Sequence, residues 1–397
     1  MMQIKCSRSW PWSKMASEKN TAAKHAESGR KNSNAERSTA VQTMKTTGDG
    51  QSIGPSVWQL IGAAILANRL VIGWVYWGGF SRRFIYATQK IDPESPGYLA
   101  NKLVHAAPGV PFGFGNIVHW MLDHGLLLHI SVISFSLVEL VVGVGLMLGL
   151  ATRFVSLIGM GLSVVLMIIF GWMGTTCLDE WTMAACSFAM TSVTLVTGSG
   201  PYSIDNLFVK SGRIERKPWL AWFTSGPLPI TPSRFVTITA LLGVLSFVFT
   251  VFFYGFFFDG IYSPLGKRFD NLHPRVTMSE GVLTKDTASV HVYMDRGPDT
   301  QGAYIVRATL ADKNGTDQPV FDYGVDALTI KDVLNITDNR FAPYSTCKAL
   351  AYSVRCQLGS QALLNFAVPA GADINGDMVL TLTDVEGKTF TAPLSER

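Results

Sequence analysis

Residues 126–150 read LLLHISVISFSLVELVVGVGLMLGL and contain a single formally charged side chain, Glu139. A helix needs about 20 mostly apolar residues to cross the hydrocarbon core of a bilayer, so this stretch predicts a membrane-spanning helix. Four other runs share this character, and several carry Trp or Tyr near an end, as spanning helices do at the membrane interface. They are residues 57–80, 154–173, 181–198 and 235–258, of which 181–198 is the shortest and the richest in serine and threonine.

The 397 residues divide into three regions of different composition. Residues 1–56 are polar and basic, lack the apolar core of a secretory signal peptide, and predict a disordered cytoplasmic tail in which Met15 or Met44 could replace Met1 as the start. Residues 57–258 predict an α-helical membrane bundle of about five spans, and residues 259–397 a small all-β sandwich. The net charge of +4 is too small to indicate nucleic acid as a partner.

The C-terminal region alternates apolar and polar residues, as in ASVHVYMD and AYIVRATLAD, between turn signals such as DKNG and DVEGK. Six or seven short strands with regular turns predict a sandwich of immunoglobulin-like or related shape, acting as a binding or assembly module. Cys347 and Cys356 are the two cysteines of this region. Without a CxxC pair they do not indicate zinc, and in an oxidising compartment they predict a disulfide.

Basic residues predict the orientation of the spans. With five spans, the basic tail and the loop carrying Lys210, Arg213, Arg216 and Lys217 fall on one side, which the positive-inside rule makes cytoplasmic. Residues 174–180 and the C-terminal domain then lie outside, where a disulfide is stable. The loop 79–125 runs against the rule, because Arg82, Arg83, Lys90 and Lys102 lie on the predicted outer face.

Two charged side chains lie near the middle of predicted spans, Arg69 in the first and Glu139 in the second. Each costs about 2.5–3.5 kcal/mol in lipid unless it is paired or faces a polar cavity. Their similar depth predicts an Arg69–Glu139 ion pair, which either fixes the helix register or takes part in function.

The outer loop mixes apolar residues with charges and predicts amphipathic helices at the membrane interface. Arg82 and Arg83 could bind a sulfur or phosphorus oxyanion, since the guanidinium fork matches such groups, or they could snorkel at the interface. Four histidines could ligate haem or carry protons, although no CxxCH motif supports haem. They are His105, His119, His124 and His129.

The stretch FGWMGTTCLDEWTMAACSFAM, residues 170–190, joins two predicted spans and contains the sequence TTCLDE. Cys177 there is either a loop cysteine or a reactive group, with Asp179 and Glu180 as a helix cap or as proton carriers. Trp172 and Trp181 flank the segment.

Three motifs, GWMGTTCLDEW, NRLVIGWVYWGGFSRR and VELVVGVGLMLGLATR, resemble DoxD, the membrane subunit of thiosulfate:quinone oxidoreductase in the wider DoxX family. The β region, including CKALAYSVRC, resembles the partner subunit DoxA. The resemblance covers about residues 57–397 and implies a DoxD–DoxA fusion in the cytoplasmic membrane, with the C-terminal domain periplasmic.

This resemblance implies a reaction in which two thiosulfates become tetrathionate and membrane quinone is reduced, without metal or flavin. On that basis Arg82, Arg83 and Arg69 are the candidate substrate-binding residues, and Glu139, Asp179, Glu180 and Cys177 the candidate catalytic ones. Cys177 could hold one thiosulfate covalently while a second attacks it. The candidate quinone-binding residues are Trp74, Trp77, Trp172 and Trp181.

Two other functions remain open from the sequence. The chain could be a non-catalytic DoxX-like anchor whose β domain recruits a sulfur-metabolism partner, and it could form a homo-oligomer. A transporter of sulfur anions is less well supported, because the number of spans is odd and no inverted repeat is visible.

Overall fold

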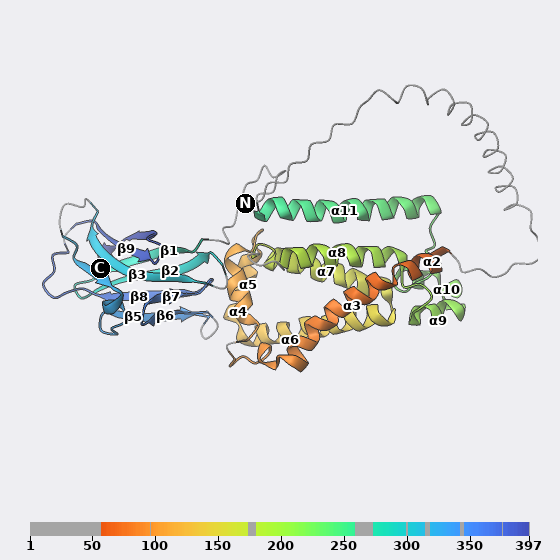
Figure 1. Ribbon diagram of the computed structural model, residues 1–397, viewed down its shortest axis with the longest axis horizontal. Coiled ribbons are helices and arrows are strands. Elements are labelled where there is room, and N and C mark those ends of the chain that lie inside the picture. The colour runs from red at the N-terminus through yellow and green to blue at the C-terminus, as the bar shows by residue number, and fades with distance from the viewer. Residues whose placement is uncertain are drawn as a thin grey trace, which may run out of the picture. The chain divides into compact units, whose positions relative to one another are not determined.

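The computed structural model describes residues 57–95, 97–173, 180–258, 273–298, 301–313, 318–341, 345–374 and 376–396. The predicted disordered tail therefore lies outside the described residues, as do Cys177 and Asp179. Helices come first along the chain and strands follow, as the sequence predicts (Figure 1).

The helical part begins with α2 (Val57–Ala64) and α3 (Leu66–Ser81), followed by the π-helical turn η2 (Arg82–Tyr86) and the 3₁₀ turn η3 (Thr88–Lys90). Next are α4 (Ala100–Ala106), η4 (Ala107–Gly109), α5 (Phe114–Asp123), α6 (Gly125–Leu148) and α7 (Thr152–Phe170). The remaining elements are α8 (Glu180–Thr197), α9 (Ile204–Lys210), α10 (Arg213–Arg216), η5 (Pro218–Trp222) and α11 (Pro232–Phe258).

Within the described residues, α6, α7 and α11 are each long and apolar enough to cross a membrane, and α2 with α3, bent by 53°, can form one further span. The chain is thus a membrane protein by the length and composition of these helices. Four of the five expected spans are found by this measure among the described residues, and α8 does not meet it.

Hydroxyl side chains explain why α8 falls short. They point into the bundle, where Thr191 and Thr194 donate to the carbonyls one turn earlier at 2.6 and 2.7 Å. The helix packs along α7 on one side and α11 on another (Figure 1). Buried hydroxyls that bond to their own helix are compatible with such an internal position, although they lower the apolarity of the segment.

Short helices occupy the outer loop of the sequence analysis. On α5, Phe114, Ile117 and Trp120 are each about half exposed, whereas Val118 and Leu122 are buried. This division confirms the amphipathic character expected for the loop. Its position at a membrane interface stays a prediction.

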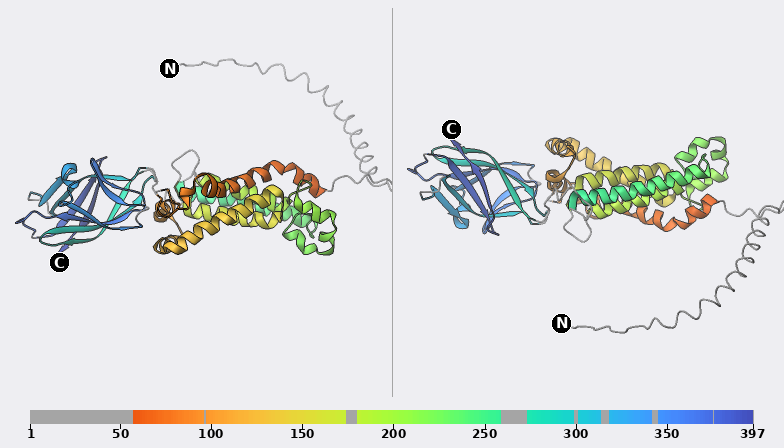
Figure 2. Two further views of the ribbon diagram at one scale, coloured as in Figure 1. Left: turned by 90° about the horizontal axis from the view of Figure 1, so that it is seen from below. Right: turned by 90° about the horizontal axis from the view of Figure 1, so that it is seen from above.

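The C-terminal part, cyan to blue in Figure 2, contains two sheets. One has the order β11-β1-β2-β8-β5 and the other β10-β9-β3-β7-β6, with β4 paired to β3. The strands are β1 (Arg275–Leu283), β2 (Thr287–Arg296), β3 (Ala303–Asp312), β4 (Phe321–Gly324), β5 (Leu334–Arg340), β6 (Cys347–Leu350), β7 (Ser353–Cys356), β8 (Gln361–Ala367), β9 (Met378–Asp384), β10 (Thr389–Pro393) and β11 (Ser395–Glu396), and α12 (Val325–Leu328) follows β4.

Alternation along the strands builds the core between the sheets. On β2, the side chains of Ala288, Val290, Val292 and Met294 are fully buried, while those between them are not. The strands exceed the expected six or seven because β4, β6, β7 and β11 have four residues or fewer, too short for a period-two pattern to reveal them.

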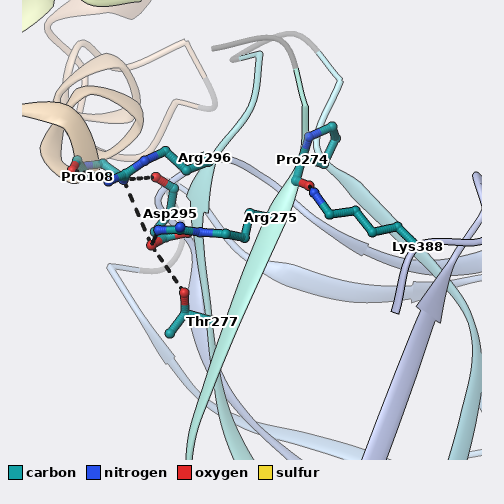
Figure 3. A network of polar contacts seen from close by, with 7 residues as sticks. All are labelled: Pro108, Pro274, Arg275, Thr277, Asp295, Arg296 and Lys388. Carbon is teal, nitrogen blue, oxygen red and sulfur yellow. Dashed lines mark hydrogen bonds and ion pairs between the residues drawn. The ribbon is translucent and has the colours of Figure 1, made fainter. Parts of the chain in front are cut away.

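The helical and β parts contact each other through the short helices. Gly359, at φ +81°, lies so close to the Val104 carbonyl of α4 that an added Cβ would come within 2.0 Å of that oxygen. Arg296 of β2 donates to the Pro108 carbonyl of η4 at 3.4 Å, next to an Asp295 carboxylate that binds Arg275 (Figure 3).

Candidate functional site

A buried ion pair joins the end of α3 to the middle of α6. Arg83 of η2 is bonded to the Glu139 carboxylate, and the two side chains are only 13% and 12% exposed. The same guanidinium donates to the Ser136 hydroxyl at 3.1 Å and lies over the Phe135 ring, 5.6 Å from its centroid. Phe135 and Ser136 are both neighbours of Glu139 on the surface of α6, because they precede it by four and three positions.

Glycine on α3 lets the carboxylate approach the backbone. A Cβ at Gly79 would come within 2.7 Å of both Glu139 oxygens, so a larger residue there would displace the carboxylate. Gly143 makes a second close approach, since its Cβ would be 2.6 Å from the Trp77 amide. The pair is therefore held where α3 and α6 are nearly in backbone contact.

Aromatic and hydroxyl groups surround this pair. Trp77, Phe80 and Phe84 form a row, with ring centroids 5.7 and 4.8 Å apart. One turn before Gly79, Tyr76 donates to the Gly159 carbonyl of α7 at 2.8 Å and lies 3.2 Å from the Ser163 hydroxyl. We call Arg83, Glu139, Ser136 and Tyr76 the midspan cluster. It offers a charged pair and hydroxyls beside flat aromatic surfaces inside a helical bundle.

The predicted Arg69–Glu139 pair was wrong. Arg69 is 1% exposed and donates to the carbonyls of Ser199 at 2.8 Å and Tyr202 at 2.6 Å, near the other end of α3. Helical rise explains the error, since Arg69 lies 14 residues, or about 21 Å, before Arg83. The helix that carries Arg69 continues through η2 to Tyr86, past the expected end at residue 80, so the residue opposite Glu139 lies later in the chain than Arg69.

A second buried network, at the beginning of α7, was not foreseen. All five N–H groups of Arg153 donate to backbone carbonyls, those of residues 195, 196, 221, 224 and 226. Asp205 accepts from the amides of Ala151 and Thr152 and from the Ser225 hydroxyl. Gly149, at φ +64°, completes the turn that brings these groups together. The motif LGLATR contained the signal, an arginine four residues after a helix-ending glycine.

The segment containing Cys177 is held at both ends by α4. Before it, Trp172 is 1% exposed and donates its indole N–H to the Ala106 carbonyl at 3.0 Å. After it, Glu180 begins α8 and forms an ion pair with Lys102. The structure thus anchors the flanks of this segment on one short helix. The roles of Cys177 and Asp179 stay predictions, because both lie outside the described residues.

The four candidate tryptophans do not gather in one place. Trp74 is 64% exposed, Trp77 lies in the aromatic row, and Trp172 is enclosed against Gly109. Trp181 contacts Tyr254 of α11 with ring centroids 5.2 Å apart, and its buried indole nitrogen has no hydrogen-bond partner in the described part of the chain.

Of the remaining candidates, Arg82 is exposed and donates to the Gly78 carbonyl at 3.1 Å. His105 is largely buried, and burial together with the nearby Arg355 and Lys102 lowers its pKa to about 4. Burial also lowers the pKa of His119, whose ring stacks on Phe341. Both imidazoles are therefore neutral at pH 7, and neither has a haem-like arrangement of partners among the described residues.

The predicted disulfide is confirmed. Cys347 and Cys356 face each other across β6 and β7, with sulfur atoms 2.09 Å apart, and both side chains are buried. The bridge closes a hairpin in the sheet core and is shielded from solutes. The described residues include no group of three or more His, Cys, Asp or Glu side chains that could hold a metal ion.

Comparison with known families gives two matches that follow each other along the chain. Residues 65–231 match the family described as TQO small subunit DoxD, and residues 257–392 match the family described as TQO small subunit DoxA. This is the tandem order that the sequence motifs indicated.

Solved structures add nothing to this. The archaellum periplasmic stator protein FlaG from Sulfolobus acidocaldarius is 16% identical, with a TM-score of 0.20, over 31% of this chain and all of its own. The stator complex of FlaF and FlaG from the same organism is 15% identical at the same TM-score, over 32% of this chain and 92% of its own. Similarity at this level carries no functional meaning.

Proposed function

We propose, since this chain belongs to the DoxD and DoxA families as a fusion of the two, that it is a thiosulfate:quinone oxidoreductase of the cytoplasmic membrane. Two thiosulfate dianions each lose one electron and join through a new S–S bond as tetrathionate. A membrane quinone takes up the two electrons and two protons and becomes a quinol.

The midspan cluster is the observation that supports quinone reduction here. Quinone reduction consumes protons within the membrane, and Glu139 places a carboxyl group, which can exchange a proton, between α3 and α6. Arg83 positions that carboxylate, and the row of Trp77, Phe80 and Phe84 offers flat surfaces for a quinone ring.

The proposed orientation puts the C-terminal domain in the periplasm. Asp205, at the start of α9, binds the first residues of α7, whereas Trp172, just past its end, binds α4. The 19-residue α7 therefore separates the basic α9–α10 segment from the helices that contact the β domain, by about 28 Å. The positive-inside rule assigns the α9–α10 side to the cytoplasm.

The test is thiosulfate-dependent reduction of a soluble quinone analogue by the purified full chain. Glu139→Gln should lower kcat about 100-fold or more, as loss of a general acid does, while Gln still accepts from Arg83 and preserves the fold. The matched control is Glu94→Gln, because Glu94 is exposed in the same outer loop and should leave the rate unchanged.

Two further outcomes are informative. If the parent chain is inert until another protein is added, it is a membrane anchor and not itself the enzyme. Cys177→Ser with unchanged activity would exclude the covalent route through that thiol while keeping the reaction.

A further inference from the structure

The proposed reaction needs a site for a small dianion, and two of the three arginines expected to provide it are already engaged. Arg69 donates to two carbonyls near the other end of α3, and Arg83 is paired with Glu139. Arg82 is exposed and stays a candidate. Further cations lie on α4 and on the β6–β7 hairpin.

Lys102 and His105 lie on one face of α4, since they are three residues apart. The Lys102 amine is paired with Glu180 but its side chain is still 41% exposed, so it can contact a solute as well. The Nε2 atom of His105 is buried and has no hydrogen-bond partner in the described ranges. A buried ring nitrogen without a partner is destabilising, and a bound acceptor or donor would offset that cost.

Arg355 approaches the same face from the β domain. It acts electrostatically on His105 together with Lys102, and Gly359, four residues after it, touches α4. Its guanidinium has two contacts in the described part of the chain, the Gln301 carbonyl at 3.3 Å and the Tyr304 ring at 5.7 Å. Neither is a carboxylate.

The neighbour of Arg355 strengthens the positive charge. Lys348 of β6 lies directly opposite Arg355 in the hairpin, and like charges in that position repel each other. In the residues that the structure describes, no acidic group is paired with either of them. A dianion beside Arg355 would relieve this repulsion.

We propose that Lys102, His105 and Arg355 form a binding site for a small divalent sulfur oxyanion at the junction between α4 and the β6–β7 hairpin. This inference builds on the proposed reaction and identifies where its thiosulfate binds. The β domain then completes the substrate site of the membrane part, which gives a physical reason for joining the two in one chain. Both flanks of the Cys177 segment lie against the same short helix.

The experiment is calorimetric titration of the purified full chain with thiosulfate, and separately with sulfate, an oxyanion of the same charge that the reaction does not consume. Arg355→Gln should weaken binding of both about 10-fold or more, the loss expected for a charge-assisted hydrogen bond. The KM for thiosulfate should rise by a similar factor, and the KM for the quinone analogue should stay unchanged.

Arg307→Gln is the matched control. Arg307 lies on β3, three residues after Tyr304, but it is exposed and paired with Asp322, so its loss should leave the affinity unaltered. If Arg355→Gln does not fold, the double variant Lys102→Gln/Glu180→Gln removes one cation of the site without leaving an unpaired charge. It should produce the same loss of affinity.

The outcomes separate this site from the proposed reaction. Binding in the parent that Arg355→Gln weakens, without any quinone reduction, keeps the site and refutes the reaction. Quinone reduction with equal thiosulfate affinity in parent and variant keeps the reaction and overturns the site. A parent that binds neither anion at millimolar concentration also overturns the site.

Discussion

Arg153 and Arg83 are both buried in the helical bundle, yet their surroundings differ. All five N–H groups of Arg153 donate to backbone carbonyls, which belong to the end of α8 and to residues 221–226. Arg83 is bound to a carboxylate and a hydroxyl, both of which can exchange protons. The difference teaches that a buried charge is not by itself a functional signal. The partners of the charge indicate its role, because backbone carbonyls hold the fold in place whereas titratable partners can take part in chemistry.

The same contrast separates the two ends of α7. At its beginning, Asp205 accepts from two amides and two hydroxyls, which leaves the carboxylate well satisfied. Past its end, His105 and Trp181 each have a buried nitrogen without a partner among the described residues. Asp205 is thus fixed by its partners, whereas His105 offers a buried nitrogen to a ligand. Arg69 Nε and Asn206 Oδ1, near Asp205, also lack a partner in the described part of the chain.

Removal of Arg153 should have the largest effect. Arg153→Ala leaves five carbonyls without a donor, and each charge-assisted bond is worth about 1.5–3 kcal/mol, so we expect no folded protein at growth temperature. Arg153→Lys should fold poorly too, because the ammonium of lysine has three donors and cannot replace the five donors of the planar guanidinium. The yield of monodisperse protein in detergent measures both. Normal yield of the alanine variant would remove the distinction between the two arginines.

Loss of the Arg83–Glu139 ion pair should lower the stability of the protein less than loss of Arg153. Arg83→Ala leaves the Glu139 carboxylate unpaired, at about 3–5 kcal/mol for a buried charge, and should lower the melting temperature. Arg83→Gln/Glu139→Gln removes both charges and should recover most of that stability without recovering quinone reduction. If the double variant is stable and fully active, the pair only sets helix register and the comparison with Arg153 fails.

Local pattern predicted the fold better than it predicted the site. Apolar run length identified α6, α7 and α11, and alternation identified the long strands β2, β3 and β9. The disulfide followed from two cysteines in a β region. These properties are local, so the sequence alone contains them.

Contacts between distant segments were not predictable in this way. Glu139 was recognised as a buried charge, but its partner Arg83 lies in η2, beyond the expected end of the first span at residue 80. Lys102, His105 and Arg355 are brought together by a contact between two parts of the chain about 250 residues apart. Their proximity arises from the tertiary structure and cannot be predicted from the composition.

Acidification should reveal the state of His105 with an effect of intermediate size. In the folded protein the pKa of His105 is about 4, below the ordinary value of 6.5. Between pH 6.5 and 4 the imidazole is therefore protonated in the unfolded chain and neutral in the folded one. Stability should therefore be unaffected above pH 6.5 and should fall as the pH decreases, by about 2 kcal/mol at pH 5. Thermal melts at pH 7.5 and pH 5 should show a smaller acid loss in His105→Gln than in the parent.

Thiosulfate sharpens this measurement. A dianion between Lys102 and Arg355 would favour the protonated imidazole, so saturating thiosulfate should reduce the acid loss of the parent but not that of His105→Gln. Equal protection of both proteins would mean that the anion binds away from His105.

The smallest effect is expected at a surface ion pair between the helical and β parts. Arg340 of β5 pairs with Asp123 of α5 at 2.7 Å, but both side chains are about 40% exposed. Exposed pairs contribute about 0–1 kcal/mol, so Arg340→Ala should shift the melting temperature little and leave the KM for thiosulfate unchanged. A large loss of thiosulfate affinity in this variant would mean that any disturbance of the junction impairs binding. The weaker binding in Arg355→Gln would then reflect a disturbed contact between the helical and β parts. Only a sulfate titration of a variant whose melting temperature is unchanged could assign the anion to Arg355.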